Sequence, residues 1–414
     1  MSDFQYRDGE LRVEGVALSD LAEQYSTPAY VYSRATIERQ WRAYDDALEG
    51  KKNLICYAVK ANSNLAILGV LASLGSGFDI VSGGELERVL RAGGEAGKIV
   101  FSGVGKRRDE MGRALDVGIK CFNVESASEL QTLNQVAAEK NMLAPVSLRV
   151  NPDVDAATHP YISTGLKENK FGIAYENALE LYQQAEKMTN IDVVGIDFHI
   201  GSQITTLAPY IDALEKLMTL VNELENNGIQ LQHIDVGGGL GIQYQDETPP
   251  DPAELVNVVC DVIKGDRYEL LFEPGRSIVG NAAVLLTRVE YLKQNSGRNF
   301  AIVDAAMNDI LRPALYDAWL SILPVQETSS AQAERYDVVG PVCESADFIG
   351  LDRELAIQEN DLLAVFSAGA YSFSMSSNYN SRPRAVELLV DSGQVLEIRK
   401  RESIESLMQG ETAL

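Results

Sequence analysis

The chain has 414 residues, of which 45% are hydrophobic and 23% are charged, a composition typical of a folded globular protein. Its length exceeds the size at which one hydrophobic core usually stops growing, so we expect two domains. The formal net charge of −24 at pH 7 would repel nucleic acid and anionic membrane surfaces, and we expect neither as a partner.

The first ten residues, MSDFQYRDGE, have neither the basic start nor the apolar core of a secretory signal, and no apolar stretch approaches the length of a membrane span. We therefore expect a cytoplasmic protein. The four cysteines, Cys56, Cys121, Cys260 and Cys343, show no CxxC spacing, and the three histidines form no HExxH pattern. The sequence thus predicts neither a disulfide framework nor a metal centre.

From about residue 54 to 273, short apolar runs alternate with amphipathic helical stretches, a pattern typical of parallel strands joined by crossover helices. Eight such units fit a (β/α)8 barrel of the TIM type, with an open doubly wound sheet as the alternative. The long loop after the fifth run, 151–172, is typical of a functional loop. The eight runs are NLICYAV, FDIV, KIVF, IKCFNV, PVSLRV, VVGIDFHI, HIDVG and YELLFE.

After residue 275 the sequence reads as strands without comparable helices between them, which predicts a separate β-domain, a β-barrel or β-sandwich. The N-terminal segment contains a possible strand and a short helix that would complete this domain from the other end of the chain. We expect the α/β barrel over 30–275 and the β-domain over 1–29 and 276–414.

Lys60 ends the first apolar run, in the stretch ICYAVKANSN, where an uncompensated ammonium group would be costly. A lysine at the end of a strand usually extends to solvent. A desolvated lysine can instead act as a nucleophilic amine and condense with a carbonyl, including the aldehyde of pyridoxal phosphate. This stretch alone leaves both interpretations open.

Polar residues also follow other predicted strands, and in a (β/α)8 barrel such positions gather at one rim. Asp79 ends the second run, Ser102 follows the third, His199 the sixth, the glycines of 237–241 the seventh and Glu273 the eighth. The glycines would let backbone amides approach an anion, although a glycine run alone is more often a tight turn. Glu273 is either a solvated carboxylate or the partner of a pyridine nitrogen. His199 is either a packing residue or a ring stacked on a flat cofactor.

Together, the motifs resemble those of the pyridoxal-phosphate decarboxylases of the alanine racemase-like fold, and most closely the diaminopimelate-specific branch of that ornithine, diaminopimelate and arginine decarboxylase family. The resemblance covers nearly the whole length. It implies decarboxylation of meso-2,6-diaminopimelate to L-lysine, the last step of lysine biosynthesis, with pyridoxal 5′-phosphate as cofactor. It rests on YAVKANSN, FDIVSGGEL, FHIGSQ, DVGGGLG, EPGRSIV, LRPALY, GPVCESAD and GAYSFSMSSNYNSRPR, in that order.

The resemblance implies a role for each residue of the cofactor site. Lys60 would hold the aldehyde covalently, His199 would pack against the ring, and Glu273 would pair with the ring nitrogen. Tyr371 would reach both cofactor and substrate. The remaining cofactor contacts implied by the family are Asp79, Ser202, Gly238, Gly239, Gly275 and Arg276.

For the substrate, the resemblance places the distal carboxylate against Arg276, Arg312 and Tyr316 and the distal ammonium against Glu344. Arginines at this point would reverse the acidic field of the chain. Cys343 would be a proton donor. The alternative is that this cysteine is only a small buried residue. The family takes this cysteine and the following glutamate from the neighbouring subunit, so the active site would belong to a homodimer.

Three alternatives remain. An ornithine, arginine or lysine decarboxylase of the same fold needs no clamp for a second carboxylate, so Arg312 and Tyr316 in LRPALY, with CES in place of CD, favour diaminopimelate. A racemase would need acid and base groups on both faces of the cofactor. A regulatory cofactor-binding protein of this fold would lack the β-domain and its CESAD and GAY segments, which this chain has.

Overall fold

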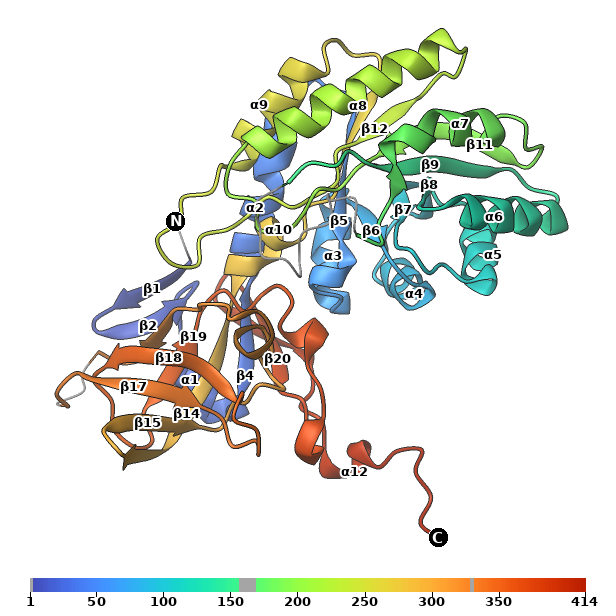
Figure 1. Ribbon diagram of the computed structural model, residues 1–414. Helices are drawn as coiled ribbons and strands as arrows, with labels where there is room; N and C mark the ends of the chain where they lie inside the picture. The colour runs from blue at the N-terminus through green and yellow to red at the C-terminus, as the bar shows by residue number, and fades with distance from the viewer. Residues whose placement is uncertain (1–2, 156–168, 328–330) are drawn as a thin grey trace. The chain divides into compact units, whose positions relative to one another are not determined.

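The computed structural model describes residues 3–155, 169–327 and 331–414 (Figure 1). Most of the loop that the sequence marked as functional therefore lies outside the described residues. The chain divides into two compact units: a barrel unit of residues 40–242 and 248–277, and a β-unit of residues 1–39, 243–247 and 278–414.

The barrel unit is built on parallel strands that coincide with the eight apolar runs of the sequence. Each strand pairs with the next along the chain, and the last pairs with the first through Leu270 and Asn53, which closes the barrel. The (β/α)8 prediction is therefore confirmed, and the open sheet is wrong. The strands are β5 (Asn53–Ala58), β6 (Gly77–Ile80), β7 (Ile99–Phe101), β8 (Cys121–Val124), β9 (Ala144–Asn151), β11 (Ile191–Asp197), β12 (His233–Asp235) and β13 (Glu269–Phe272), with the short β10 (Ile173–Ala174) beside β9.

Helices flank these strands (Figure 1), and several begin at residues whose side chains cap them. Asn64, Ser82, Ser126 and Asp251 each accept a hydrogen bond from a backbone N–H in the first turn, which satisfies a donor that the helix itself leaves unpaired. The helices are α2 (Arg34–Ala47), α3 (Leu65–Ser73), α4 (Gly83–Arg91), α5 (Arg108–Val117), α6 (Ala127–Lys140), α7 (Tyr175–Ala185), α8 (Ala208–Asn226), α9 (Pro252–Val262) and α10 (Arg276–Val279).

The β-unit confirms the expected second, β-rich part of the fold. Its large sheet includes the N-terminal strand β4 (Ala29–Ser33), which lies between β14 (Ala283–Asn295), its antiparallel partner, and β20 (Val386–Asp391), its parallel partner. Val31, Val284 and Leu388 are fully buried in the core between these strands. The N-terminal segment thus belongs to the β-rich part.

The other elements of the β-unit include a small antiparallel sheet of β1 (Phe4–Arg7), β2 (Glu10–Val13) and β3 (Val16–Ala17). In the described residues, no helix has the length and apolar character needed to cross a membrane. The remaining elements are α1 (Leu18–Tyr25), β15 (Arg298–Val303), α11 (Arg312–Tyr316), β16 (Ile322–Pro324), β17 (Glu334–Val339), β18 (Phe348–Leu355), β19 (Leu362–Val365), β21 (Gln394–Arg399) and α12 (Ile404–Leu407).

Candidate active site

Lys60 and Asp79 form an ion pair at the carboxyl ends of two adjacent barrel strands. Lys60 lies in the single 3-10 turn that follows β5, and Asp79 lies within β6. The distance from Lys60 Nζ to Asp79 Oδ2 is 2.5 Å. The aspartate side chain is fully buried, whereas 37% of the lysine side chain is exposed. The amine therefore lies at the rim, with a buried carboxylate beside it and one side accessible.

Three buried carboxyl groups lie together inside the same end of the barrel. Asp197, Asp235 and Glu273 end or follow β11, β12 and β13, and one oxygen of each lies within 4.8 Å of the others. Burial, together with the neighbouring carboxylates, raises the pKa of Glu273 and Asp197 well above the ordinary range and that of Asp235 to about 6. Glu273 and Asp197 therefore favour their protonated forms near neutral pH, whereas Asp235 loses its proton as the pH rises through about 6. Glu273 is buried, so its alternative as a solvated carboxylate is wrong.

Two neutral side chains hold the glutamate of this group. Asn123, in β8, donates from Nδ2 to Glu273 Oε1 across 3.2 Å, and Ser102 donates from Oγ to the same oxygen across 3.3 Å. Sequence reasoning placed the serine at the rim but missed the asparagine. The signal was a single polar residue in the apolar run IKCFNV, a position that a buried strand seldom gives to an amide.

The glycines after β12 approach neighbouring backbone so closely that no side chain fits. A Cβ atom added to Gly238 would lie 2.2 Å from the carbonyl oxygen of Glu273, and one added to Gly239 would lie 2.3 Å from that of Gly201. Gly237 and Gly239 also have positive φ angles of 67° and 106°. The loop is therefore a tight backbone cradle that depends on glycine.

His199, which follows β11, is oriented by this loop. The backbone N–H of Gly238 donates to Nδ1 of the histidine across 3.2 Å, so Nε2 carries the proton in the neutral ring. Burial, with the nearby positive charges of Arg149 and Lys60, lowers the pKa of His199 well below its ordinary value. The ring is therefore uncharged at neutral pH.

Arg276 and Gly275 lie directly after the glutamate. Arg276 is buried and donates from Nη2 to Oγ of Ser202 across 2.9 Å. A Cβ atom on Gly275 would lie 3.0 Å from Cβ of Ala61, next to the lysine. The predicted residues of the barrel unit therefore form one continuous group around the rim.

The residues of this rim fit pyridoxal phosphate. They combine an amine, a carboxyl group that can hold a proton toward a basic ring nitrogen, and a glycine cradle where backbone can approach a phosphate. One oxygen of the buried Asp79, Oδ1, has no hydrogen-bond partner among the described residues. An unsatisfied buried acceptor of this kind is consistent with a donor supplied by a ligand.

The β-unit carries the remaining predicted residues. Arg312, at the start of α11, is buried, donates from Nη1 to the hydroxyl of Tyr244 across 2.8 Å and lies 4.7 Å from the centre of its ring. Tyr316 ends the same helix, and Tyr371 has a positive φ of 56°. Tyr244 was missed because nothing in GIQYQDE marks it as the partner of a distant arginine.

Cys343 and Glu344 lie on an exposed loop of the β-unit. The cysteine is free and exposed, so its alternative as a small buried residue is wrong for the single chain. Its backbone N–H donates to Oδ1 of Asn380 across 3.4 Å, and the hydroxyl of Tyr379 donates to the carboxylate of Glu344.

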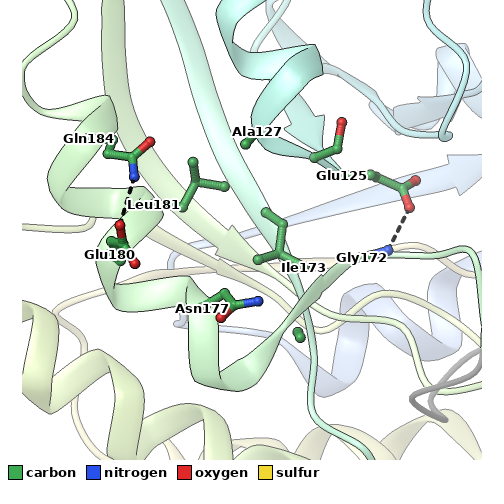
Figure 2. Close-up of a pocket in the computed structure, with 10 residues that line it drawn as sticks. Glu125, Ala127, Gly172, Ile173, Asn177, Glu180, Leu181 and Gln184 are labelled. Carbon is green, nitrogen blue, oxygen red and sulfur yellow. Dashed lines mark hydrogen bonds between the residues drawn. The ribbon is translucent and has the colours of Figure 1, made fainter.

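A separate hollow of about 330 Å³ lies between the loop after β8 and helix α7 (Figure 2). Its wall includes Glu125, Ile173, Asn177 and Glu180, and none of the predicted site residues. Glu125 Oε2 accepts a hydrogen bond from the backbone of Gly172 there, so its carboxylate serves the structure of the barrel.

The chain is similar to known proteins of one family. Residues 34–280 match the family model described as pyridoxal-dependent decarboxylase, pyridoxal binding domain. A diaminopimelate decarboxylase of Pseudomonas aeruginosa is 60% identical over the full length of both chains. The structure is similar to diaminopimelate decarboxylase from M. jannaschii in co-complex with L-lysine (TM-score 0.95, 38% identity, 99% and 98% of the two chains) and to that from Helicobacter pylori complexed with L-lysine (0.91, 44%, 95% and 98%).

Proposed function

The chain belongs to the pyridoxal-dependent decarboxylases, within them to the diaminopimelate decarboxylase family, and we propose that it converts meso-2,6-diaminopimelate to L-lysine and carbon dioxide. Its cofactor is pyridoxal 5′-phosphate. The observation that carries the proposal is the continuous group at the barrel rim, in which the Lys60 amine, the buried Glu273 carboxyl and the glycine cradle lie on adjacent strand ends.

In this proposal the rim residues hold the cofactor. Lys60 binds its aldehyde, and Glu273 keeps a proton on its ring nitrogen. The neutral ring of His199 packs against its face, and Asp79 keeps the amine of Lys60 in place. The phosphate is held by Ser202, Gly238, Gly239, Gly275 and Arg276. When bound, pyridoxal phosphate accepts the electron pair that is left when the carboxyl group departs.

The substrate contacts follow from charge and shape. Arg312 is fixed by Tyr244, so its planar guanidinium is preorganised for a bidentate contact with a carboxylate. Arg276 and Tyr316 complete the contact with the distal carboxylate. This clamp distinguishes diaminopimelate from ornithine and lysine, which lack a second carboxylate. Tyr371 contacts both cofactor and substrate.

We also propose that the protein is a homodimer with shared active sites. Cys343 and Glu344 are exposed on the single chain, and each would serve the site of the partner subunit. There the glutamate binds the distal ammonium and the thiol supplies a proton to the carbon that loses carbon dioxide.

The test is a parallel assay of carbon dioxide release from meso-diaminopimelate and from ornithine by the purified protein with added cofactor. We expect release from diaminopimelate and little from ornithine. The variant Arg312→Met should raise the KM for diaminopimelate by roughly tenfold to a hundredfold, because a hydrogen bond to a charged group is worth about 1.5–3 kcal/mol. Equal turnover of the two substrates by the wild type would overturn the substrate assignment.

A further inference from the structure

Glu273 is supported by two donors that the proposed function does not use. The amide of Asn123 and the hydroxyl of Ser102 both donate to its oxygen Oε1. Both side chains are buried, the asparagine completely. They come from the ends of neighbouring strands, so the pairing of β7 with β8 places them side by side. The two bonds meet on one oxygen, and Oε2 receives neither of them.

Asn123 also links Glu273 to the adjacent carboxyl group of Asp235. Its Nδ2 lies 3.5 Å from Asp235 Oδ2 and 3.2 Å from Ser102 Oγ. The other oxygen of Asp235 accepts from the backbone N–H of Gly237 across 2.9 Å. A primary amide contributes two donor hydrogens, and placing them between two buried carboxyl groups reduces the repulsion between those groups.

A buried lysine fixes the backbone that carries these two donors. The side chain of Lys106 is fully buried, and its Nζ donates to the carbonyl oxygen of Asn123 across 2.7 Å and to that of Gly103 across 2.8 Å. Its third acceptor is the carboxylate of Glu129, at 2.7 Å. The ends of β7 and β8 are therefore held before any ligand arrives, which is the preorganisation that a positioning role requires.

We propose that Asn123 and Ser102 are positioning residues that hold Glu273 ready to pass a proton to the ring nitrogen of the cofactor and then stabilise the remaining carboxylate. This inference rests on the proposed role of Glu273. In the step, the O–H bond of the carboxyl group breaks as the N–H bond forms, and the negative charge stays on the glutamate. Hydrogen bonds to an anion are stronger than those to a neutral acid, so both donors favour the transfer.

The electrostatics of the barrel agree with this direction of transfer. Burial raises the pKa of Glu273 well above its ordinary range, so the group holds a proton before the cofactor binds. Asp197, the third carboxyl group, has one oxygen with no hydrogen-bond partner among the described residues. The fixed donors therefore favour the anion on Glu273, whereas the charge of Asp197 is balanced by Arg149, whose Nε lies 4.0 Å from Asp197 Oδ2.

The experiment uses the holoenzyme reconstituted with pyridoxal phosphate that is 15N-labelled at the ring nitrogen. The 15N chemical shift reports protonation of that nitrogen independently of turnover. We expect a protonated nitrogen in the wild type and a shift toward the unprotonated value in Asn123→Leu and in Ser102→Ala. Their kcat should fall by about tenfold, the loss expected when one hydrogen bond to a charged group is removed.

Ser147→Ala is the matched control for Ser102→Ala. Ser147 lies in β9, is fully buried, and its hydroxyl has no hydrogen-bond partner among the described residues. It should keep the wild-type chemical shift and kcat. A protonated nitrogen in Ser102→Ala, or an equal change in Ser147→Ala, would overturn the positioning role even if Asn123→Leu does not fold. An unprotonated nitrogen in the wild type would instead overturn the role of Glu273 itself.

Discussion

The amine of Lys60 lies 2.5 Å from a carboxylate, that of Asp79, which is completely buried. This pair answers the question that an ammonium group at the end of an apolar strand raises. The adjacent strand β6 supplies the counter-charge, and the lysine stays at the rim, partly exposed. The lysine is therefore the charge partner of the buried Asp79 carboxylate as well as the proposed attachment point of the cofactor.

Replacing Lys60 with methionine should destabilise the apoprotein, because the Asp79 carboxylate is left buried without its positive partner. We expect a loss of about 2 kcal/mol in the free energy of unfolding, between the values for exposed and buried pairs, since the lysine is partly exposed. The double variant Lys60→Met/Asp79→Asn should recover most of this loss, because it also removes the buried charge. Urea denaturation measures the free energy of unfolding of both variants.

The surface pair of Lys51 and Asp266 provides the control for this experiment. Their Nζ to Oδ1 distance is 3.0 Å, and the lysine is exposed to the same extent as Lys60, but the carboxylate of Asp266 is exposed where that of Asp79 is buried. Lys51→Met should leave the urea midpoint unchanged. If Lys60→Met were as stable as the wild type, the buried carboxylate would not depend on the lysine.

Asp235→Asn should change how stability depends on pH. The folded-state pKa of Asp235 is raised to about 6, from 3.8 in the unfolded chain, so the folded state binds the proton more tightly. The stabilisation from that proton is complete below pH 3.8 and is lost as the pH rises through 6. The asparagine cannot ionise, so the variant does not lose this stabilisation. Its free energy of unfolding, relative to that of the wild type, should therefore increase by up to about 3 kcal/mol from pH 4 to pH 7.5.

Unfolding of the two apoproteins in urea at several pH values checks this expectation. A stability difference that stays constant from pH 4 to pH 7.5 would mean that Asp235 does not change its protonation in this range. An increase with falling pH would contradict the sign of the shift.

Gly239→Ala should weaken cofactor binding, because the new Cβ atom would lie 2.3 Å from the carbonyl oxygen of Gly201 and φ at this position is +106°. Moving the cradle should raise the dissociation constant for pyridoxal phosphate by at least about tenfold. Titration of the apoprotein, followed by absorbance, measures it. Gly97→Ala, where an added Cβ meets nothing within 4 Å, should bind normally. Equal affinity of the two variants would remove the glycine loop from the cofactor site.

Mixing two inactive variants tests whether subunits share active sites. A heterodimer of Lys60→Ala and Glu344→Gln would contain one site with both intact residues, so an equal mixture should recover about a quarter of the wild-type activity. Lys60→Ala mixed with His199→Ala should recover none, because both residues would come from the same subunit. Recovery in neither mixture would favour sites built within one chain.

Much of the fold could be predicted because its signals are local. Each apolar run reports one buried parallel strand, and the barrel rule then places Lys60, Asp79, His199 and Glu273 at one rim. The pairing of the lysine with the aspartate follows from the adjacency of β5 and β6. These relations need only the order of the strands.

The support of Glu273 could not be predicted in the same way. Asn123 and Asp235 lie inside or at the end of short strands, and sequence does not say which of their neighbours each side chain faces. The carboxyl cluster exists because β11, β12 and β13 are adjacent and their side chains point inward, which the closed barrel determines. The contact of Tyr244 with Arg312 could not be predicted either, because it joins positions 68 residues apart.

Attachment of the cofactor to Lys60 is tested most directly by reducing the holoenzyme with borohydride and then identifying the modified peptide by proteolysis and mass spectrometry. We expect a single modified peptide that contains Lys60 and carries the reduced cofactor, and no such peptide from Lys60→Ala. Cofactor attached to another lysine, such as Lys106 or Lys120, or an unmodified Lys60 peptide from active enzyme, would contradict it.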